Sequence, residues 1–153
     1  MSATNAFYNY IVNPVMRKLL NSSLHGIVSK NIAILYFTGK RSGRALSTPL
    51  SYAREGNTVR FLSSQNTRWW RNFRGADAPV SVEIARERFD GSARLLEGES
   101  PEFNDGVARF INAVPRDAVI YGLKLDGEKK LVTASLAAKA DHVILVEVTL
   151  DNS

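Results

Sequence analysis

The chain has 153 residues, 44% of them hydrophobic and 23% charged, which is the composition of one compact domain rather than of a disordered or fibrous protein. Cysteine is absent and only two histidines occur, which excludes disulfides and thiolate chemistry and argues against a catalytic metal site. The net charge of +5 is uneven, since residues 40–94 carry eleven bases and five acids whereas residues 95–153 carry six bases and ten acids, so the cationic middle segment predicts an anionic partner.

The first predicted element is a helix over residues 5–30, in which apolar side chains recur at helical spacing and Pro14 marks a kink or boundary. Such a helix either packs across a sheet or touches an anionic membrane weakly, because Arg17 and Lys18 flank its apolar stripe. The sequence shows neither a run of 18 apolar residues nor the pattern of a signal peptide. We therefore expect one cytoplasmic domain over residues 1–153, with at most weak peripheral membrane contact.

Strands are predicted in the middle of the chain. Residues 32–37 are continuously apolar and rich in β-branched and aromatic types, which indicates a strand buried on both faces. Residues 48–54 and 58–63 alternate on either side of a short turn, and residues 80–84 alternate toward a second turn near residues 90–91. The connections are too short for parallel crossovers, so we expect antiparallel hairpins.

A short helix is predicted between the two hairpins, where Asn66 or Thr67 can cap a segment that carries Trp69 and Trp70. Adjacent residues on a helix point about 100° apart. At most one of the two tryptophans is therefore expected deep in the core, while the other reaches a pocket rim.

The end of the chain predicts two further helices and a last strand. Ser100 can cap a helix that begins at Pro101 and continues at helical spacing until Pro115. Residues 131–140 are expected to be helical, and residues 143–150 to form a strand. This order of elements favours an α+β fold, with a small antiparallel barrel and flanking helices.

Common catalytic signatures are missing from the sequence. It contains no G-x-S-x-G nucleophile elbow, no P-loop and no dinucleotide-binding G-x-G-x-x-G. Asp141 and His142 are adjacent, which orients neither toward a serine, so a hydrolase triad is not expected. No catalytic residue and no metal ligand can be assigned from these patterns.

The strongest local signal is the segment Thr38-Gly39-Lys40-Arg41-Ser42-Gly43-Arg44, directly after the first strand. Its glycines permit a tight turn that exposes backbone amides, and a hydroxyl and three cations surround the turn, a combination that suits a phosphate group. An ordinary solvated basic hairpin explains the same residues. A second signal is the arginine at every third position from Arg68 to Arg74, beside tryptophans that either stack on a planar ring or form core.

Three pieces of sequence, taken in order, resemble the deazaflavin-dependent nitroreductase family of split β-barrel oxidoreductases. They are Phe37-Thr38-Gly39-Lys40-Arg41-Ser42-Gly43, then Thr48-Pro49-Leu50 at the opening of the next strand, and Ser63-Ser64 followed by Trp69-Trp70-Arg71-Asn72. The resemblance covers about residues 20–97 and implies a split β-barrel fold. Past Ser100 only Tyr121 stands out as a candidate substrate contact.

The resemblance also implies binding of coenzyme F420, a hydride carrier with a phosphodiester and an oligoglutamate tail. The implied contacts with the phosphate and the tail are Lys40, Arg41, Ser42 and Gly43, and Arg44 can supply a further cation. The implied contacts near the ring and its ribityl chain are Thr48, Pro49, Leu50, Ser63, Ser64, Trp69, Trp70 and Asn72. Of the two tryptophans, the family position favours Trp69 on the cofactor side.

The expected function is therefore an oxidoreductase that moves a hydride from reduced F420 to an electron-poor small molecule, such as a quinone, an enone or a nitro compound. Two alternatives remain open from the residues. The same barrel can hold FMN or haem, or the chain can be a module for single-stranded nucleic acid in which Trp69 and Trp70 stack on bases. Under the F420 interpretation, the partner is a small molecule and neither nucleic acid nor metal is expected.

Overall fold

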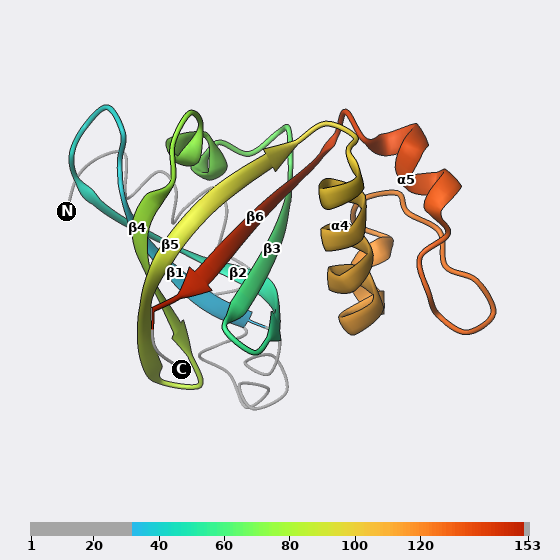
Figure 1. Ribbon diagram of the computed structural model, residues 1–153, viewed down its shortest axis with the longest axis horizontal. Helices are drawn as coiled ribbons and strands as arrows, with labels where there is room; N and C mark the ends of the chain where they lie inside the picture. Colours follow the sequence, from blue (N-terminus) through green and yellow to red (C-terminus); the bar gives the residue numbers. More distant parts are fainter. Residues whose placement is uncertain (1–31, 152–153) are drawn as a thin grey trace.

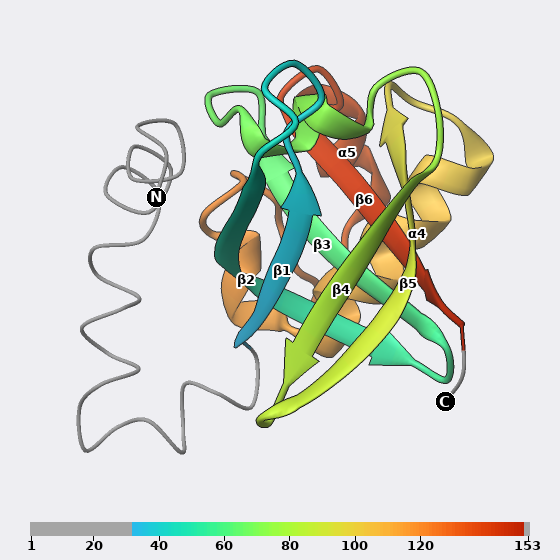
Figure 2. The same ribbon diagram turned by 90° about the vertical axis from the view of Figure 1, so that its left-hand side faces the viewer.

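The computed structural model describes residues 32–151, which form an antiparallel barrel flanked by helices (Figures 1 and 2). The helix expected over residues 5–30 lies outside the described residues. The strands are β1 (Ile32–Thr38), β2 (Ala45–Glu55), β3 (Thr58–Ser64), β4 (Ala78–Ile84), β5 (Glu87–Glu97) and β6 (Val143–Leu150). They close in the order β1-β2-β3-β6-β5-β4, and every neighbouring pair is antiparallel. The expected α+β class and small antiparallel barrel are confirmed.

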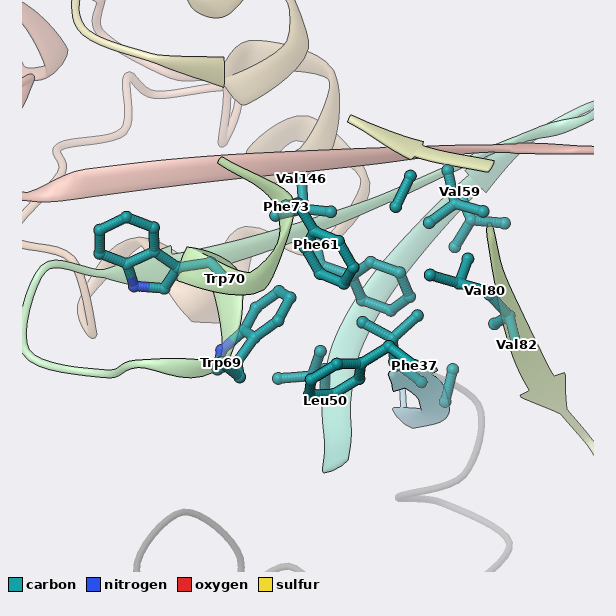
Figure 3. Packing of buried hydrophobic residues seen from close by; sticks show 14 of the residues in the cluster. Phe37, Leu50, Val59, Phe61, Trp69, Trp70, Phe73, Val80, Val82 and Val146 are labelled. Carbon is teal, nitrogen blue, oxygen red and sulfur yellow. The ribbon is translucent and has the colours of Figure 1, made fainter. Parts of the chain in front are cut away.

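Alternate side chains of the strands fill the interior of the barrel. Leu35 and Phe37 of β1 face inward, where they meet Phe61 of β3 and Val146 of β6 in one apolar cluster. Figure 3 shows side chains from different strands and from the segment after β3 converging in this cluster. Because side chains of a strand alternate between its two faces, the other half of each strand is left to face outward.

A second apolar cluster lies outside the barrel, under the helix α4 (Pro101–Ala113). Phe103, Val107 and Phe110 are fully buried on this helix, which contacts β2, β3 and β6. Ser100 caps the helix as predicted, because its Oγ accepts a hydrogen bond from the Phe103 N–H at 3.1 Å. The apolar spacing of α4 therefore gives one outer face of the barrel a fixed cover.

The rest of the helical flank consists of the 3-10 helix η2 (Pro115–Ala118) and the helix α5 (Thr133–Lys139) (Figure 1). α5 is shorter than the helix predicted over residues 131–140, because Leu131 forms an isolated bridge with Leu125 before the helix begins. Within residues 32–151, no helix combines the length and the apolar character that crossing a bilayer would require.

The second hairpin turns earlier than the sequence predicted. β4 and β5 are joined at Ala85 and Arg86, whose φ angles are 50° and 69°, whereas Asp90 and Gly91 lie within β5. Two positive φ angles suit the twist of a hairpin, but sequences usually mark such a turn with Asn or Gly, and neither residue occurs at these two positions. Gly91 has another role, since a Cβ there would lie 2.5 Å from the carbonyl oxygen of Thr149 on the neighbouring strand.

We expect Gly91→Ala to lower the free energy of unfolding by about 1–3 kcal/mol, because β5 and β6 must move apart to admit the methyl group. Gly127→Ala is the matched control, since nothing lies within 4 Å of a Cβ at that position. Urea unfolding of both variants measures the difference. Equal stabilities for the two variants would contradict the close approach of β5 to β6.

Candidate cofactor site

The basic turn, residues 39–44 between β1 and β2, is closed by its own backbone. The Gly39 N–H donates to the Arg44 carbonyl at 2.8 Å, and the Gly43 N–H donates to the Gly39 carbonyl at 2.9 Å, with Gly43 at a φ of 68°. Ser42 Oγ accepts a hydrogen bond from the Arg44 N–H at 3.2 Å. The backbone amides of Gly39, Gly43 and Arg44, which were candidates for binding a phosphate, therefore donate within the turn instead. An anion at this turn therefore meets mainly its exposed cationic side chains.

Asn72 joins the basic turn to the 3-10 helix η1 (Trp69–Phe73). Its Oδ1 accepts from the Lys40 N–H at 2.8 Å, and its Nδ2 donates to the Trp69 carbonyl at 2.9 Å. The ammonium of Lys40 also donates to the carbonyl of Arg74, directly after η1. Two segments that are 32 residues apart in sequence therefore meet at one end of the barrel, as both views show (Figures 1 and 2).

We expect Asn72→Ala to cost about 1–2 kcal/mol of stability, because it removes both hydrogen bonds of the side-chain amide. Asn72→Asp keeps an acceptor for the Lys40 N–H but places a carboxylate oxygen against the Trp69 carbonyl, so we expect it to lose stability as well. Urea unfolding of both variants measures the losses. Unchanged stability of Asn72→Ala would show that this side chain does not hold the turn to η1.

Exposed arginines from both segments gather at this end of the barrel. Arg41 and Arg44 of the turn, and Arg68 before η1, form no ion pair with any residue in the described part of the chain. Arg74 pairs with Glu97 at 2.9 Å, and this hydrogen bond and the charge of Glu97 raise the pKa of the Arg74 guanidinium. Cations without partners concentrate positive potential, which is the condition for capturing an anion.

Trp69 and Trp70 are both buried, at 0% and 1% exposure, so the expectation that only one lies deep in the protein is wrong. Figure 3 shows the two rings pointing apart. The Trp69 N–H donates to Ser63 Oγ at 3.1 Å, and the Trp70 N–H donates to the Ser64 carbonyl at 3.1 Å. Because both acceptors belong to the last two residues of β3, η1 lies against the end of that strand, and both rings are buried there. Trp69 also contacts Phe61 edge-on, with ring centroids 6.4 Å apart.

The start of η1 differs from the prediction as well. Arg68 precedes the helix without capping it, so neither Asn66 nor Thr67 is its cap. The Thr67 hydroxyl instead donates to the Ser64 carbonyl at 3.0 Å and hydrogen-bonds the Ser63 hydroxyl. Threonine side chains readily make such local bonds in place of a cap, and here they fasten the end of β3 to the segment that follows.

The other residues implied by the resemblance lie on β2 and β3. Thr48, Leu50 and Ser63 are at most 9% exposed, Pro49 is buried as well, and Ser64 is half-buried. Strand alternation directs Thr48 inward with Leu50, and Pro49 to the opposite face. The structure therefore brings the basic turn and Asn72 together at an exposed end of the barrel. The implied residues of β2 and β3 belong to the barrel wall. Their contact with a cofactor stays a prediction.

A hollow of about 500 Å³ crosses β1, β4 and β5, and the sequence did not point to it. The Arg88 guanidinium lies 3.9 Å from the ring centroid of Tyr36, whose hydroxyl donates to Glu83 at 3.1 Å. Burial, with the hydrogen bond to Glu83, raises the pKa of Tyr36. A volume of this size can hold a small molecule. Only the register of β1 on β4, which pairs Tyr36 with Ser81, brings these residues together.

Three residues that the sequence analysis considered remain: Tyr121, His25 and His142. The Tyr121 hydroxyl donates to the Leu62 carbonyl at 3.0 Å, and burial, together with the charge of Asp117, raises the pKa of Tyr121. His142 is exposed, and His25 lies outside the described residues. Within residues 32–151 no three His, Cys, Asp or Glu side chains are grouped to hold a metal ion.

Comparison with known proteins gives one family and a shared fold. The family model of the F420H(2)-dependent quinone reductases matches residues 15–122. An F420-H2 dependent reductase, FDR-A, is 19% identical with a TM-score of 0.55, covering 78% of this chain and 94% of that one. No functionally curated protein matches the chain.

Two further solved structures have the same architecture. The haem storage protein HutZ from Vibrio cholerae is 14% identical with a TM-score of 0.50, covering 92% of this chain and 91% of that one. A protein related to general stress protein 26, of the pyridoxinephosphate oxidase family, from Clostridium acetobutylicum is 10% identical with a TM-score of 0.54, covering 88% and 84%. At such identities the likeness concerns the fold, which is the split β-barrel implied by the sequence.

Proposed function

The chain belongs to the F420H2-dependent quinone reductase family, and on this premise we propose that it transfers a hydride from reduced coenzyme F420 to an electron-poor small molecule. Quinones, enones and nitro compounds are the acceptors we include. The proposal places the protein in the cytoplasm. The observation that carries it is the meeting of two cationic segments at one end of the barrel, tied together through Asn72.

The residues at this end fit the anionic part of the cofactor. Arg41 and Arg44 are exposed and free of ion pairs within the described residues, and a guanidinium binds phosphate or carboxylate oxygens through paired N–H donors. Ser42 accepts a bond from a backbone amide and keeps its own proton to donate. Lys40 adds charge from a fixed position, and Gly43 permits close approach. We assign the phosphodiester and the glutamate tail to this turn.

The ring would be held beside the same end by residues of β2, β3 and η1. We assign its border to Pro49, Ser64 and Asn72, and the wall behind it to Thr48, Leu50, Ser63, Trp69 and Trp70. Hydrogen bonds from both indoles to the end of β3 keep this wall rigid. A rigid apolar wall supports catalysis by fixing orientation and excluding water.

Reduced F420, when bound, supplies the hydride, which leaves binding, orientation and shielding to the protein. The cationic turn fixes the anionic end, and the buried wall fixes the plane against which the acceptor must lie. No side chain has to act as a nucleophile. This division of work agrees with a sequence that lacks cysteine.

The alternatives differ in what they require of this site. Base stacking needs exposed aromatic faces, whereas both indoles are buried, so the argument for a nucleic-acid module loses its main support. FMN and haem remain alternative ligands of the same barrel. FMN shares a phosphate with F420 but has no glutamate tail, so the two arginines without partners favour F420.

Titration of the purified protein with F420, FMN, haem and a single-stranded oligonucleotide, at one salt concentration, tests the proposal. We expect the tightest binding for F420, followed by oxidation of reduced F420 when a quinone is added. Tighter binding of FMN or haem would change the cofactor, and tighter binding of the oligonucleotide would overturn the function altogether.

A further inference from the structure

The helical flank displays an apolar surface that the proposed function does not use. In the turn after η2, Val119 is 85% exposed and Ile120 is 69% exposed, and no other large apolar side chain in the described part of the chain is exposed. Single apolar residues on a surface are ordinary, but two adjacent ones at the tip of a turn form a local patch.

The turn that carries this patch is ordered. The Ile120 N–H donates to the Asp117 carbonyl at 3.1 Å, and the Gly122 N–H donates to the Val119 carbonyl at 3.2 Å. The next residue, Tyr121, is anchored by its hydroxyl to the carbonyl of Leu62 on β3. The exposure of the two aliphatic side chains is therefore held in place by the fold rather than caused by a frayed end.

Two lysines lie beside the turn that carries the patch. Between residues 114 and 140 the chain carries five bases and three acids, and Arg116 and Asp117 of this set pair with each other at 3.3 Å. The side chain of Lys139 lies over Gly122, because a Cβ on that glycine would be 3.1 Å from Lys139 Cε. Lys124 follows the same turn, and its N–H is fixed by Ser135 of α5 at 3.0 Å. Lys124 and Lys139 are both exposed, so they add positive charge beside the patch.

We propose that this turn docks on the surface of an anionic lipid bilayer, with Val119 and Ile120 entering the boundary between headgroups and acyl chains. Lys124 and Lys139 would lie over the headgroups, because lysine stems bury beside apolar groups while their ammonium groups stay in the polar layer. Anionic lipids attract each such cation near the surface. The inference is independent of the cofactor that the barrel binds.

A protein partner fits this patch less well than a bilayer. A stable protein interface buries about 800 Å² on each partner, far more than two aliphatic side chains offer. Oppositely charged surfaces on another protein would satisfy the lysines but would not require a protruding apolar tip. A second copy of this chain would also present the same positive charge to itself in a symmetric contact.

Co-sedimentation of the full chain with vesicles tests the proposal. We expect binding to mixed phosphatidylserine and phosphatidylcholine vesicles at low salt, and little binding to phosphatidylcholine alone. The double variant Val119→Ser, Ile120→Ser should bind at least about tenfold more weakly, because insertion of both aliphatic groups is lost. Lys124→Gln, Lys139→Gln should weaken binding by a similar factor at low salt, and its difference from the unaltered protein should disappear at high salt because the charges are then screened.

A matched charge control separates a specific surface from general attraction. Arg86→Gln, Arg88→Gln removes the same charge from the β4–β5 hairpin, outside the helical flank, and should leave vesicle binding unchanged. Failure of the unaltered protein to sediment with anionic vesicles would overturn the proposal, as would unchanged binding by the Val119, Ile120 variant. A smaller size of that variant in gel filtration would assign the patch to contact between copies instead.

Fluorescence gives a second readout that does not rest on a lost signal. The two native tryptophans are buried, so Ile120→Trp adds an indole that starts in water. Its emission should shift to shorter wavelength when anionic vesicles are added, and should not shift with an anionic polymer of matched charge such as heparin. An unchanged spectrum with bound vesicles would show that this turn stays outside the bilayer, which contradicts the proposal.

Discussion

The double variant Arg41→Ala, Arg44→Ala is expected to bind F420 at least about a hundredfold more weakly than the unaltered protein. A charge-assisted hydrogen bond contributes about 1.5–3 kcal/mol, so the loss of two corresponds to about 3 kcal/mol or more, and each 1.4 kcal/mol is about a factor of ten in affinity. Neither side chain pairs with another described residue, so stability should barely change. Fluorescence titration with F420 and thermal unfolding measure the two quantities.

Two controls make this result specific. Lys129→Ala, Lys130→Ala removes the same charge from an exposed loop of the helical flank and should leave F420 affinity unchanged. Lys40→Ala should reduce both affinity and stability, because its ammonium group holds the carbonyl that follows η1. Equal weakening by the two double variants would mean that only net charge matters and that the turn is not the phosphate site.

The barrel could be predicted because its strands carry recognisable patterns of apolar side chains. The apolar run from Ile32 to Phe37 and the apolar residues of 143–150 each fit one strand, and both strands occur where expected. The turn at Ala85 and Arg86 could not be predicted, because its left-handed backbone is imposed by the paired strands and has no glycine or asparagine to mark it.

The candidate site could be predicted in its parts and not in its assembly. The basic turn and the tryptophan segment each have a local pattern, but the bond from the Lys40 N–H to Asn72 joins residues far apart in sequence. The hydrogen bond from the Lys40 ammonium group to the Arg74 carbonyl could not be predicted from local sequence either, because it depends on where η1 ends. Sequence patterns thus identified which segments are cationic, while only the fold decides which cations are left without partners.

Replacing Trp69 with alanine is expected to lower the free energy of unfolding by about 3–5 kcal/mol, the range for removing a large aromatic side chain from a core. The ring is fully buried, meets Phe61 and Phe73 edge-on at centroid distances of 6.4 and 6.2 Å, and donates its N–H to Ser63 Oγ at 3.1 Å. Its removal would leave both a cavity and a buried hydroxyl without one of its partners. Urea unfolding measures the loss.

Trp69→Phe separates the core role from the cofactor role that the resemblance suggests for this residue. Phenylalanine retains most of the apolar contact and loses the hydrogen bond to Ser63, so we expect a much smaller loss of stability than for alanine. If Trp69 serves the wall behind the ring, the folded phenylalanine variant should also keep most of its affinity for F420. Unchanged stability combined with a large loss of F420 affinity would instead place the indole against the cofactor, which requires the barrel end to open when the cofactor binds.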